Sequence, residues 1–437
     1  MSALGKYVLN RGGELFGYDA MPSERTENLQ KAGAKIYFSA TIGEEEKAVI
    51  NSAEKIVCTS AVSKGNSRFD ECLAQGKSVV FRGEFLGKVA SSFPFTVSVA
   101  GSHGKTTCTS MCAHIFLSAN RRFTAHAGGD DLALGNYFEN GEDYFLTEAC
   151  EYKKNLLYLH PNVAVLLNID RDHMECYRNE AELTQTFAEY CSSANASLVC
   201  ADDEKIRSAR LSEIYPTFGL ENQNAYFTAK SIEGKREMYS FDFCEGGKKI
   251  CRVSLNVAGR CHILNALAAG GAARLCGISA EHIVDGLNAF EGVKRRFEKI
   301  GEYRGATWYC DYAHHPREIS ATLKTATALT EGKLYVIFQP HTYSRTKNLK
   351  EDFICSLSAA GNLAVFKEYA AREKYDEAGS AKRLSENVCG ATYCDTDGEL
   401  ESFAAQGGAG DTVLFLGAGD IYDRAKAILQ SRNRNSV

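Results

Sequence analysis

The segment between residues 95 and 117 constrains the fold more than any other part of the chain. Residues 95–100 have the pattern of a buried strand, which leads into Gly101-Ser102-His103-Gly104-Lys105-Thr106-Thr107 and a helical pattern over residues 106–117. Glycines let backbone N–H groups approach a phosphate, a lysine supplies positive charge, and a threonine hydroxyl can reach Mg²⁺. The spacing differs from GxxxxGK(S/T), because Val99 stands at the place of the first glycine. We predict nucleotide binding, with an ordinary glycine-rich turn as the alternative.

Acidic residues and a histidine follow two further strand patterns. Glu148 ends the pattern at residues 144–147, and Asp170-Arg171-Asp172-His173 follows the pattern at residues 163–169. Open parallel sheets bind ligands at the carboxyl ends of their strands, so Glu148 and His173 are candidate ligands of a divalent metal beside the phosphates. Taken singly, each residue is more often a cap of a strand or helix.

The length of the chain calls for more than one domain. With 437 residues it exceeds what one hydrophobic core usually organises. The patterns divide it into three α/β segments, residues 1–92, 93–297 and 298–437. In the third segment we predict strands at residues 307–312, 334–338 and 412–416, and an exposed loop at residues 371–380.

The first segment opens on a helical pattern. We predict that strands follow at residues 15–18, 35–38, 56–59 and 78–81. A doubly wound nucleotide-binding unit has a strand and a glycine-rich turn before such a helix, and neither stands before this one. We therefore expect an incomplete Rossmann-like domain.

Composition excludes several classes of protein. The formal net charge is −5 and positive charge forms no long run, so we expect no nucleic-acid partner. Sixteen cysteines are scattered along the chain without a CxxC pair, which indicates reduced thiols. No apolar run approaches the roughly 20 residues that span a bilayer. We expect a cytoplasmic protein with small-molecule partners and no membrane insertion.

Short motifs along the chain follow the glycine loop in the order found in Mur ligases. They are Glu148-Ala149-Cys150-Glu151, Asn168-Ile169-Asp170-Arg171-Asp172-His173, Gly259-Arg260 to Asn265, Arg295-Arg296-Phe297, Asp311-Tyr312-Ala313-His314-His315-Pro316, Gln339-Pro340-His341-Thr342-Tyr343-Ser344-Arg345-Thr346, and Leu416-Gly417-Ala418-Gly419-Asp420. The ordered set covers all three segments, so the chain resembles the Mur ligase family. The blocks at residues 311–316 and 339–345 most resemble its alanine-adding branch.

The resemblance implies a fold and an activity. The fold is α/β with three domains: a Rossmann-like domain for the UDP substrate, incomplete here, a central P-loop ATPase domain, and a Rossmann-like C-terminal domain that contacts amino acid and nucleotide. The activity is ATP- and Mg²⁺-dependent joining of L-alanine to the lactyl carboxylate of UDP-N-acetylmuramate through an acyl phosphate, in peptidoglycan precursor synthesis. Two alternatives stay open: a murein-peptide ligase that attaches a tripeptide to the same nucleotide sugar, and a catalytically silent ATP-binding partner protein.

The resemblance also implies roles for individual residues. Those implied to contact ATP are Gly101, Ser102, His103, Gly104, Lys105, Thr106, Thr107, His262, Asn265, Arg296 and Asp311. The implied catalytic set is Lys105, Glu148, His173, Arg296 and Asp311. The implied Mg²⁺ ligands are Thr106, Glu148 and His173, and the implied amino-acid contacts are Tyr312, His341 and Arg345. The chain departs from the family at the adenine-contacting motif, where Cys261-His262 replaces a His-Asn pair and Asn265 is kept.

Overall fold

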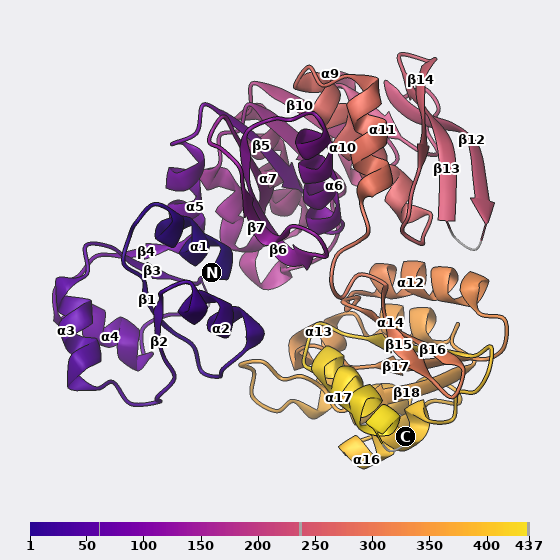
Figure 1. Ribbon diagram of the computed structural model, residues 1–437. Helices are drawn as coiled ribbons and strands as arrows, with labels where there is room; N and C mark the ends of the chain where they lie inside the picture. Colours follow the sequence, from indigo (N-terminus) through magenta and orange to yellow (C-terminus); the bar gives the residue numbers. More distant parts are fainter. Residues whose placement is uncertain (61, 236–237, 435–437) are drawn as a thin grey trace. The chain divides into compact units, whose positions relative to one another are not determined.

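The computed structural model describes residues 1–60, 62–235 and 238–434, and the chain divides into two compact units. The first unit comprises Met1–Lys230, Asp242–Val253 and Leu264–Ala289, and the second comprises Ser231–Phe241, Ser254–Ile263 and Phe290–Val437. Figure 1 shows the helices and strands of both. Among the described residues, no helix is both long enough and apolar enough to cross a membrane.

Short parallel strands alternate with helices at the start of the first unit. The elements are α1 (Ser2–Asn10), β1 (Phe16–Tyr18), α2 (Glu24–Lys31), β2 (Lys35–Tyr37), α3 (Glu44–Ser52), β3 (Ile56–Cys58), α4 (Ser67–Ala74), β4 (Val79–Phe81) and α5 (Arg82–Ala90). β1 pairs with β2 and β3 pairs with β4, both in parallel. Each of the four strands predicted from the sequence is found, one residue shorter than predicted.

A ten-stranded sheet lies mostly in the first unit, with β5 (Phe95–Ala100) near its middle; its residues 231–235 and 238–241 belong to the second unit. Its other strands are β6 (Phe123–Asp131), β7 (Gly135–Glu139), β8 (Tyr144–Ala149), β9 (Val163–Leu166), β10 (Ala196–Cys200), β11 (Thr217–Gly219), β12 (Phe227–Lys235), β13 (Met238–Glu245) and β14 (Lys248–Ser254). The strand order is β14-β13-β12-β11-β10-β9-β5-β8-β6-β7. β5 pairs in parallel with both β8 and β9, so the carboxyl ends of these three strands lie side by side.

Helices and short 3₁₀ segments lie between these strands, and two further helices follow the last strand in the chain. They are α6 (Lys105–Ser118), η1 (Tyr152–Tyr158), η2 (Met174–Cys176), α7 (Glu180–Ser192), α8 (Glu204–Ser208), α9 (Leu211–Ile214), α10 (Cys261–Leu275) and α11 (Ala280–Ala289). Every residue of α6 from 106 to 116 is buried. α6 meets α11 backbone to backbone, because a Cβ atom added to Gly286 would lie 2.4 Å from the Cα atom of Ile115. The position of α6 is therefore fixed by close packing.

The second unit is built on a six-stranded sheet. Its strands are β15 (Glu298–Tyr303), β16 (Ala306–Asp311), β17 (Leu334–Phe338), β18 (Asn362–Phe366), β19 (Thr392–Cys394) and β20 (Thr412–Leu416), in the order β15-β16-β20-β17-β18-β19. Its helices are α12 (Pro316–Leu329), α13 (Tyr343–Asn348), α14 (Lys350–Leu357), η3 (Glu377–Gly379), α15 (Ala381–Ser385), α16 (Asp397–Ala404) and α17 (Ile421–Arg434). All neighbouring strands are parallel except β15, which runs antiparallel to β16.

The core of the second unit lies on both faces of this sheet. Trp308 on β16 is 1% exposed and packs against Phe415 on β20, with 5.1 Å between ring centroids. The predicted strand at residues 307–312 is found one residue earlier, and the other two are found as predicted. The predicted loop at residues 371–380 is mostly exposed, but it contains the turn η3, and Gly379 and Ser380 are buried.

Candidate active site

The loop between β5 and α6 has a backbone that requires glycine at two positions. Gly101 and Gly104 have φ angles of 141° and 85°, values that residues with side chains rarely adopt. The space is closed as well, because a Cβ atom on Gly104 would lie 2.8 Å from Oδ1 of Asn265 on α10. α6 begins at Lys105, directly after the loop, and the first N–H groups of a helix have no partner within it. This arrangement suits binding of a phosphate.

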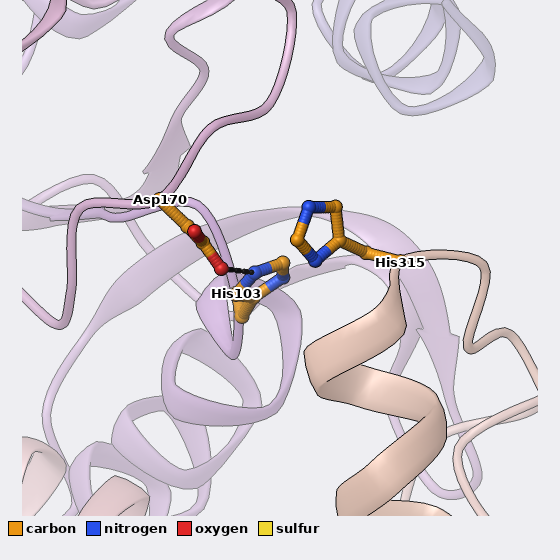
Figure 2. A group of neighbouring side chains, drawn as sticks. All are labelled: His103, Asp170 and His315. Carbon is orange, nitrogen blue, oxygen red and sulfur yellow. Dashed lines mark hydrogen bonds and ion pairs between the residues drawn. The ribbon is translucent and has the colours of Figure 1, made fainter. Parts of the chain in front are cut away.

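The segment after β9 holds the loop in shape. The N–H group of His103 donates to Oδ1 of Asn168 at 2.8 Å, and Nδ2 of Asn168 donates to the carbonyl of His103 at 3.0 Å. The N–H group of Asp170 donates to Oγ of Ser102 at 2.8 Å. Figure 2 shows the Asp170 carboxylate beside the His103 ring, with 3.0 Å between Oδ2 and Nε2. Hydrogen bonds with the segment after β9 therefore fix the loop.

Lys105 forms an ion pair inside the site. Its Nζ atom lies 3.1 and 3.0 Å from the two carboxylate oxygens of Glu151, whose side chain is 1% exposed. Nζ also donates to the carbonyl oxygen of Ser102 at 3.1 Å. Burial acts to lower the pKa of Lys105, but the charge and hydrogen bonds of Glu151, together with the charge of Glu148, act in the opposite direction, and the net effect is a raised pKa. The ammonium group is therefore charged at neutral pH.

Glu151 also belongs to a group of possible metal ligands. One ligand atom from each of Glu151, Asp172 and His173 lies within 4.8 Å of the others. Glu148 lies outside this group, and its Oε1 atom accepts a hydrogen bond from the N–H group of Gly128 at 2.5 Å. Carboxylate oxygens are the ligands that Mg²⁺ prefers, and a neutral imidazole nitrogen is a common metal ligand.

In the second unit, Asp311 ends β16 with a carboxyl group that is hydrogen-bonded to the backbone. Its Oδ2 atom accepts from the N–H group of Phe297 and its Oδ1 atom from the N–H group of Ala313, both at 2.7 Å. Burial raises the pKa of Asp311 to about 6, although the Arg296 charge and the two N–H groups act to lower it. The Arg296 guanidinium lies over the Tyr312 ring, 5.0 Å from its centroid.

The raised pKa of Asp311 predicts a pH-dependent contribution to stability. An aspartate in an unfolded chain has a pKa near 3.9, so between about pH 4 and pH 6 the folded state binds more protons, and stability falls as the pH rises through this window. Asp311→Asn should remove this contribution, so that the stability of wild type relative to the variant falls as the pH rises. Urea unfolding followed by circular dichroism across this range measures the slope. Glu302→Gln, at a carboxylate that is 56% exposed, is the control; equal slopes for wild type and Asp311→Asn would contradict the prediction.

The residues expected to contact the amino acid lie close to one another in the second unit. Nη1 of Arg345 lies 3.2 Å from Nδ1 of His341. The His341 ring stacks on Tyr369 with 5.6 Å between centroids and meets His314 edge-on at 6.0 Å. The ring of Tyr312 packs against His314 at 5.1 Å. A guanidinium beside aromatic rings suits recognition of a carboxylate.

Two further predicted nucleotide contacts lie on α10. Asn265 faces Gly104 in the first unit. Burial, assisted by the charge of Arg296, lowers the pKa of His262 to about 4, so its imidazole is neutral at neutral pH.

The structure distributes the predicted residues over both units and adds residues that were given no role. The first unit holds the loop at residues 101–107 with Glu148, His173 and Asn265, and the side chains of Thr106 and Thr107 are buried in the first turn of α6. The second unit holds His262, Arg296, Asp311, Tyr312, His341 and Arg345. Sequence reasoning gave no role to Glu151, Asn168, Asp170 or Asp172. The sequence feature that could have identified them is their position inside motifs that also contain predicted ligands.

A strand, a glycine loop and a helix that begins with a half-buried, ion-paired lysine define a nucleotide phosphate-binding protein of the P-loop kind. Three family models match the chain: the Mur ligase family catalytic domain at residues 1–94, the Mur ligase middle domain at residues 99–273, and the Mur ligase glutamate ligase domain at residues 295–419. The chain belongs to the Mur ligase family. The predicted α/β fold with three Mur ligase domains is confirmed; the boundaries at residues 92 and 297 stay predictions.

Similar proteins include an enzyme of known name. The UDP-N-acetylmuramate--L-alanine ligase of Clostridium acetobutylicum is 37% identical over 435 residues, which cover 97% of this chain and 93% of the relative. The solved structure of the UDP-N-acetylmuramate-alanine ligase MurC from Thermotoga maritima matches with a TM-score of 0.84 and 24% identity, covering 100% of this chain and 97% of that one. A murein peptide ligase from Psychrobacter arcticus matches with a TM-score of 0.76 and 20% identity, covering 99% and 96%. These two structures show the shared fold.

Proposed function

We propose that this chain is an ATP-dependent ligase that forms an amide bond between L-alanine and the lactyl carboxylate of UDP-N-acetylmuramate. The observation that carries the proposal is the 37% identity, over nearly the whole chain, to a ligase of that name. The loop at residues 101–107 and the Arg345 guanidinium supply groups suited to phosphates and to an amino-acid carboxylate. We place the reaction in peptidoglycan precursor synthesis and in the cytoplasm, where ATP is made.

The proposed reaction has two steps. The lactyl carboxylate attacks the γ-phosphorus of ATP, and ADP leaves to give an acyl phosphate. The alanine amine then attacks the acyl carbon, inorganic phosphate leaves, and the nitrogen loses a proton. A free carboxylate is a poor acyl donor, so the first step creates the leaving group, and the main contributions of the protein are positioning and neutralisation of charge.

The residues on each unit have distinct proposed tasks. Lys105 and the N–H groups of the loop at residues 101–107 hold the β- and γ-phosphates, and Asn265 and His262 contact the nucleotide base. Arg296 and Asp311 contact the nucleotide from the second unit. The proposed contacts of alanine are Tyr312, His341 and Arg345.

Mg²⁺ is part of the proposal as well. Thr106, Glu148 and His173 would hold it, and the carboxylates of Glu151 and Asp172 lie close enough to His173 to contribute. The donor set fits, because it combines hard oxygen atoms with one imidazole. When bound, Mg²⁺ neutralises charge on the phosphates.

Omission of single components tests the proposed function. Purified protein should release ADP and phosphate only when ATP, Mg²⁺, UDP-N-acetylmuramate and L-alanine are all present, because the acyl phosphate is consumed by the amine. The measurement is a coupled ADP assay with mass spectrometry of the nucleotide-sugar product. Equal turnover with a cell-wall tripeptide in place of alanine would support the murein-peptide ligase instead. No ADP release with all four components would reject ligase activity.

A further inference from the structure

The ammonium group of Lys105 already has a full set of acceptors. An ammonium group has three protons to donate. Nζ of Lys105 donates to the carbonyl oxygens of Gly101 and Ser102 at 2.5 and 3.1 Å, and to the two oxygens of Glu151 at 3.1 and 3.0 Å. A phosphate that binds Lys105 must therefore displace at least one of these partners. Glu151 is the only one of the three that carries a negative charge, so it competes most directly with phosphate.

The backbone that carries Glu151 is anchored on several sides. The hydroxyl group of Tyr177 donates to the carbonyl oxygen of Glu151. The following residues Lys153 and Lys154 both have positive φ angles, 51° and 57°, which are rare for residues other than glycine. Nζ of Lys153 donates to the carbonyl oxygen of Ser60 at 2.5 Å. Lys105 has a flexible four-carbon stem, whereas Glu151 stands on a restrained backbone, so an exchange of partners moves Lys105.

We propose that Glu151 is a positioning residue that acts through Lys105: it holds the lysine folded back over the loop, and the phosphates of a nucleotide take its place when they bind. The proposal rests on the proposed function in one respect, namely that nucleotide binds at this loop. Glu151 then opposes nucleotide binding in two ways. Its ion pair with Lys105 is lost when nucleotide binds, and its charge repels the incoming phosphates.

Removal of that charge should therefore tighten nucleotide binding. A residue that only supported the fold of the loop would do the opposite, because its loss would weaken binding. Glu151→Gln keeps the size of the side chain and one oxygen acceptor for Lys105. We expect ADP to bind about tenfold more tightly to this variant, which corresponds to the loss of one modest competing charge interaction.

Titration calorimetry with ADP in the presence of EDTA tests the proposal without metal, nucleotide sugar or amino acid. The matched control is Glu182→Gln, because the Glu182 carboxylate pairs with Lys154, three residues after Glu151 in the chain, at 2.7 Å and not with Lys105. The control should bind ADP like wild type, and Glu151→Asp, which keeps the charge, should remain closer to wild type than Glu151→Gln. Equal or weaker binding of ADP by Glu151→Gln would overturn the proposal.

Thermal unfolding gives a second readout that is independent of the yield of active protein. The increase in Tm produced by a saturating amount of ADP should be larger for Glu151→Gln than for wild type, because a tighter ligand stabilises the folded state more. An equal or smaller increase would contradict the exchange of partners. If neither wild type nor any variant binds ADP, with EDTA or with Mg²⁺, the loop is not a nucleotide site, and the proposed function fails together with this inference.

Discussion

A Lys105→Ala variant should lose turnover by about 100- to 1000-fold, the range seen when one charged or hydrogen-bonding group that stabilises a transition state is removed. Negative charge moves toward the leaving phosphate oxygens during phosphoryl transfer, and Lys105 is the lysine of the loop that begins α6. The measurement is the steady-state rate of ADP release with all substrates saturating. Lys88→Ala, at an exposed position on α5, should keep the rate of wild type.

The same substitution leaves the Glu151 carboxylate buried without its partner, which destabilises the fold. The double variant Lys105→Ala/Glu151→Gln removes both charges and should recover most of the lost stability. It should not recover turnover. A double variant that regains the rate of wild type would show that Lys105 acts on stability alone, and its proposed catalytic role would be wrong.

Gly286→Ala should destabilise the first unit by about 3 kcal/mol, near the upper end for overpacking of a core. The added Cβ atom would lie 2.4 Å from the Cα atom and 2.6 Å from the backbone nitrogen of Ile115. Backbone atoms of a buried helix cannot move aside as a flexible side chain can, so α6 and α11 must separate. Without this clash, replacement of glycine by alanine in a helix would stabilise the fold by about 1 kcal/mol. A destabilised Gly286→Ala variant would therefore point to the close packing of the two helices.

Thermal unfolding followed by far-ultraviolet circular dichroism measures this effect. A loss of this size should lower the transition of the first unit by roughly 6–12 °C. Gly398→Ala on α16 is the matched control, because a Cβ atom there would meet nothing within 4 Å, and it should leave the transition unchanged or raise it slightly. A Gly286→Ala variant as stable as wild type would mean that the two helices tolerate a wider separation.

Several strands were predicted accurately from the sequence. β5, β17 and β20 were located to the residue; β17 and β20 have nearly continuous apolar runs, and β5 has apolar residues at positions 95, 97 and 99. β6, β7 and β10 to β14 were not predicted. Residues 230–235 of β12 are exposed or only half-buried, so neither an apolar run nor an alternation marks the strand. A long strand with little buried surface is held in place by backbone hydrogen bonds to neighbouring strands. Such bonds do not require a periodic pattern of apolar side chains, so a single sequence does not show them.

Part of the candidate site was likewise predictable. The loop at residues 101–107 was predictable from its glycines and its lysine. Glycines allow the backbone to approach a phosphate, and the lysine supplies positive charge. The residues that contact the loop were not predictable in this way. Asn168 and Glu151 contact it across 65 and 46 residues of chain, and the sequence alone does not distinguish Glu148 from Glu151 as the acid beside Lys105. Such pairings depend on the order of strands in the sheet.

The position of the only tryptophan provides an intrinsic fluorescence probe of the second unit. Trp308 is the single tryptophan of the chain, and it lies 1% exposed in the core of the second unit. Its fluorescence emission therefore reports solvent exposure in that unit alone, whereas dichroism reports both. A difference between the two signals during denaturation would reveal units that unfold independently, and coincident signals would reveal one cooperative transition. The units are thus distinguishable in solution without any attached dye.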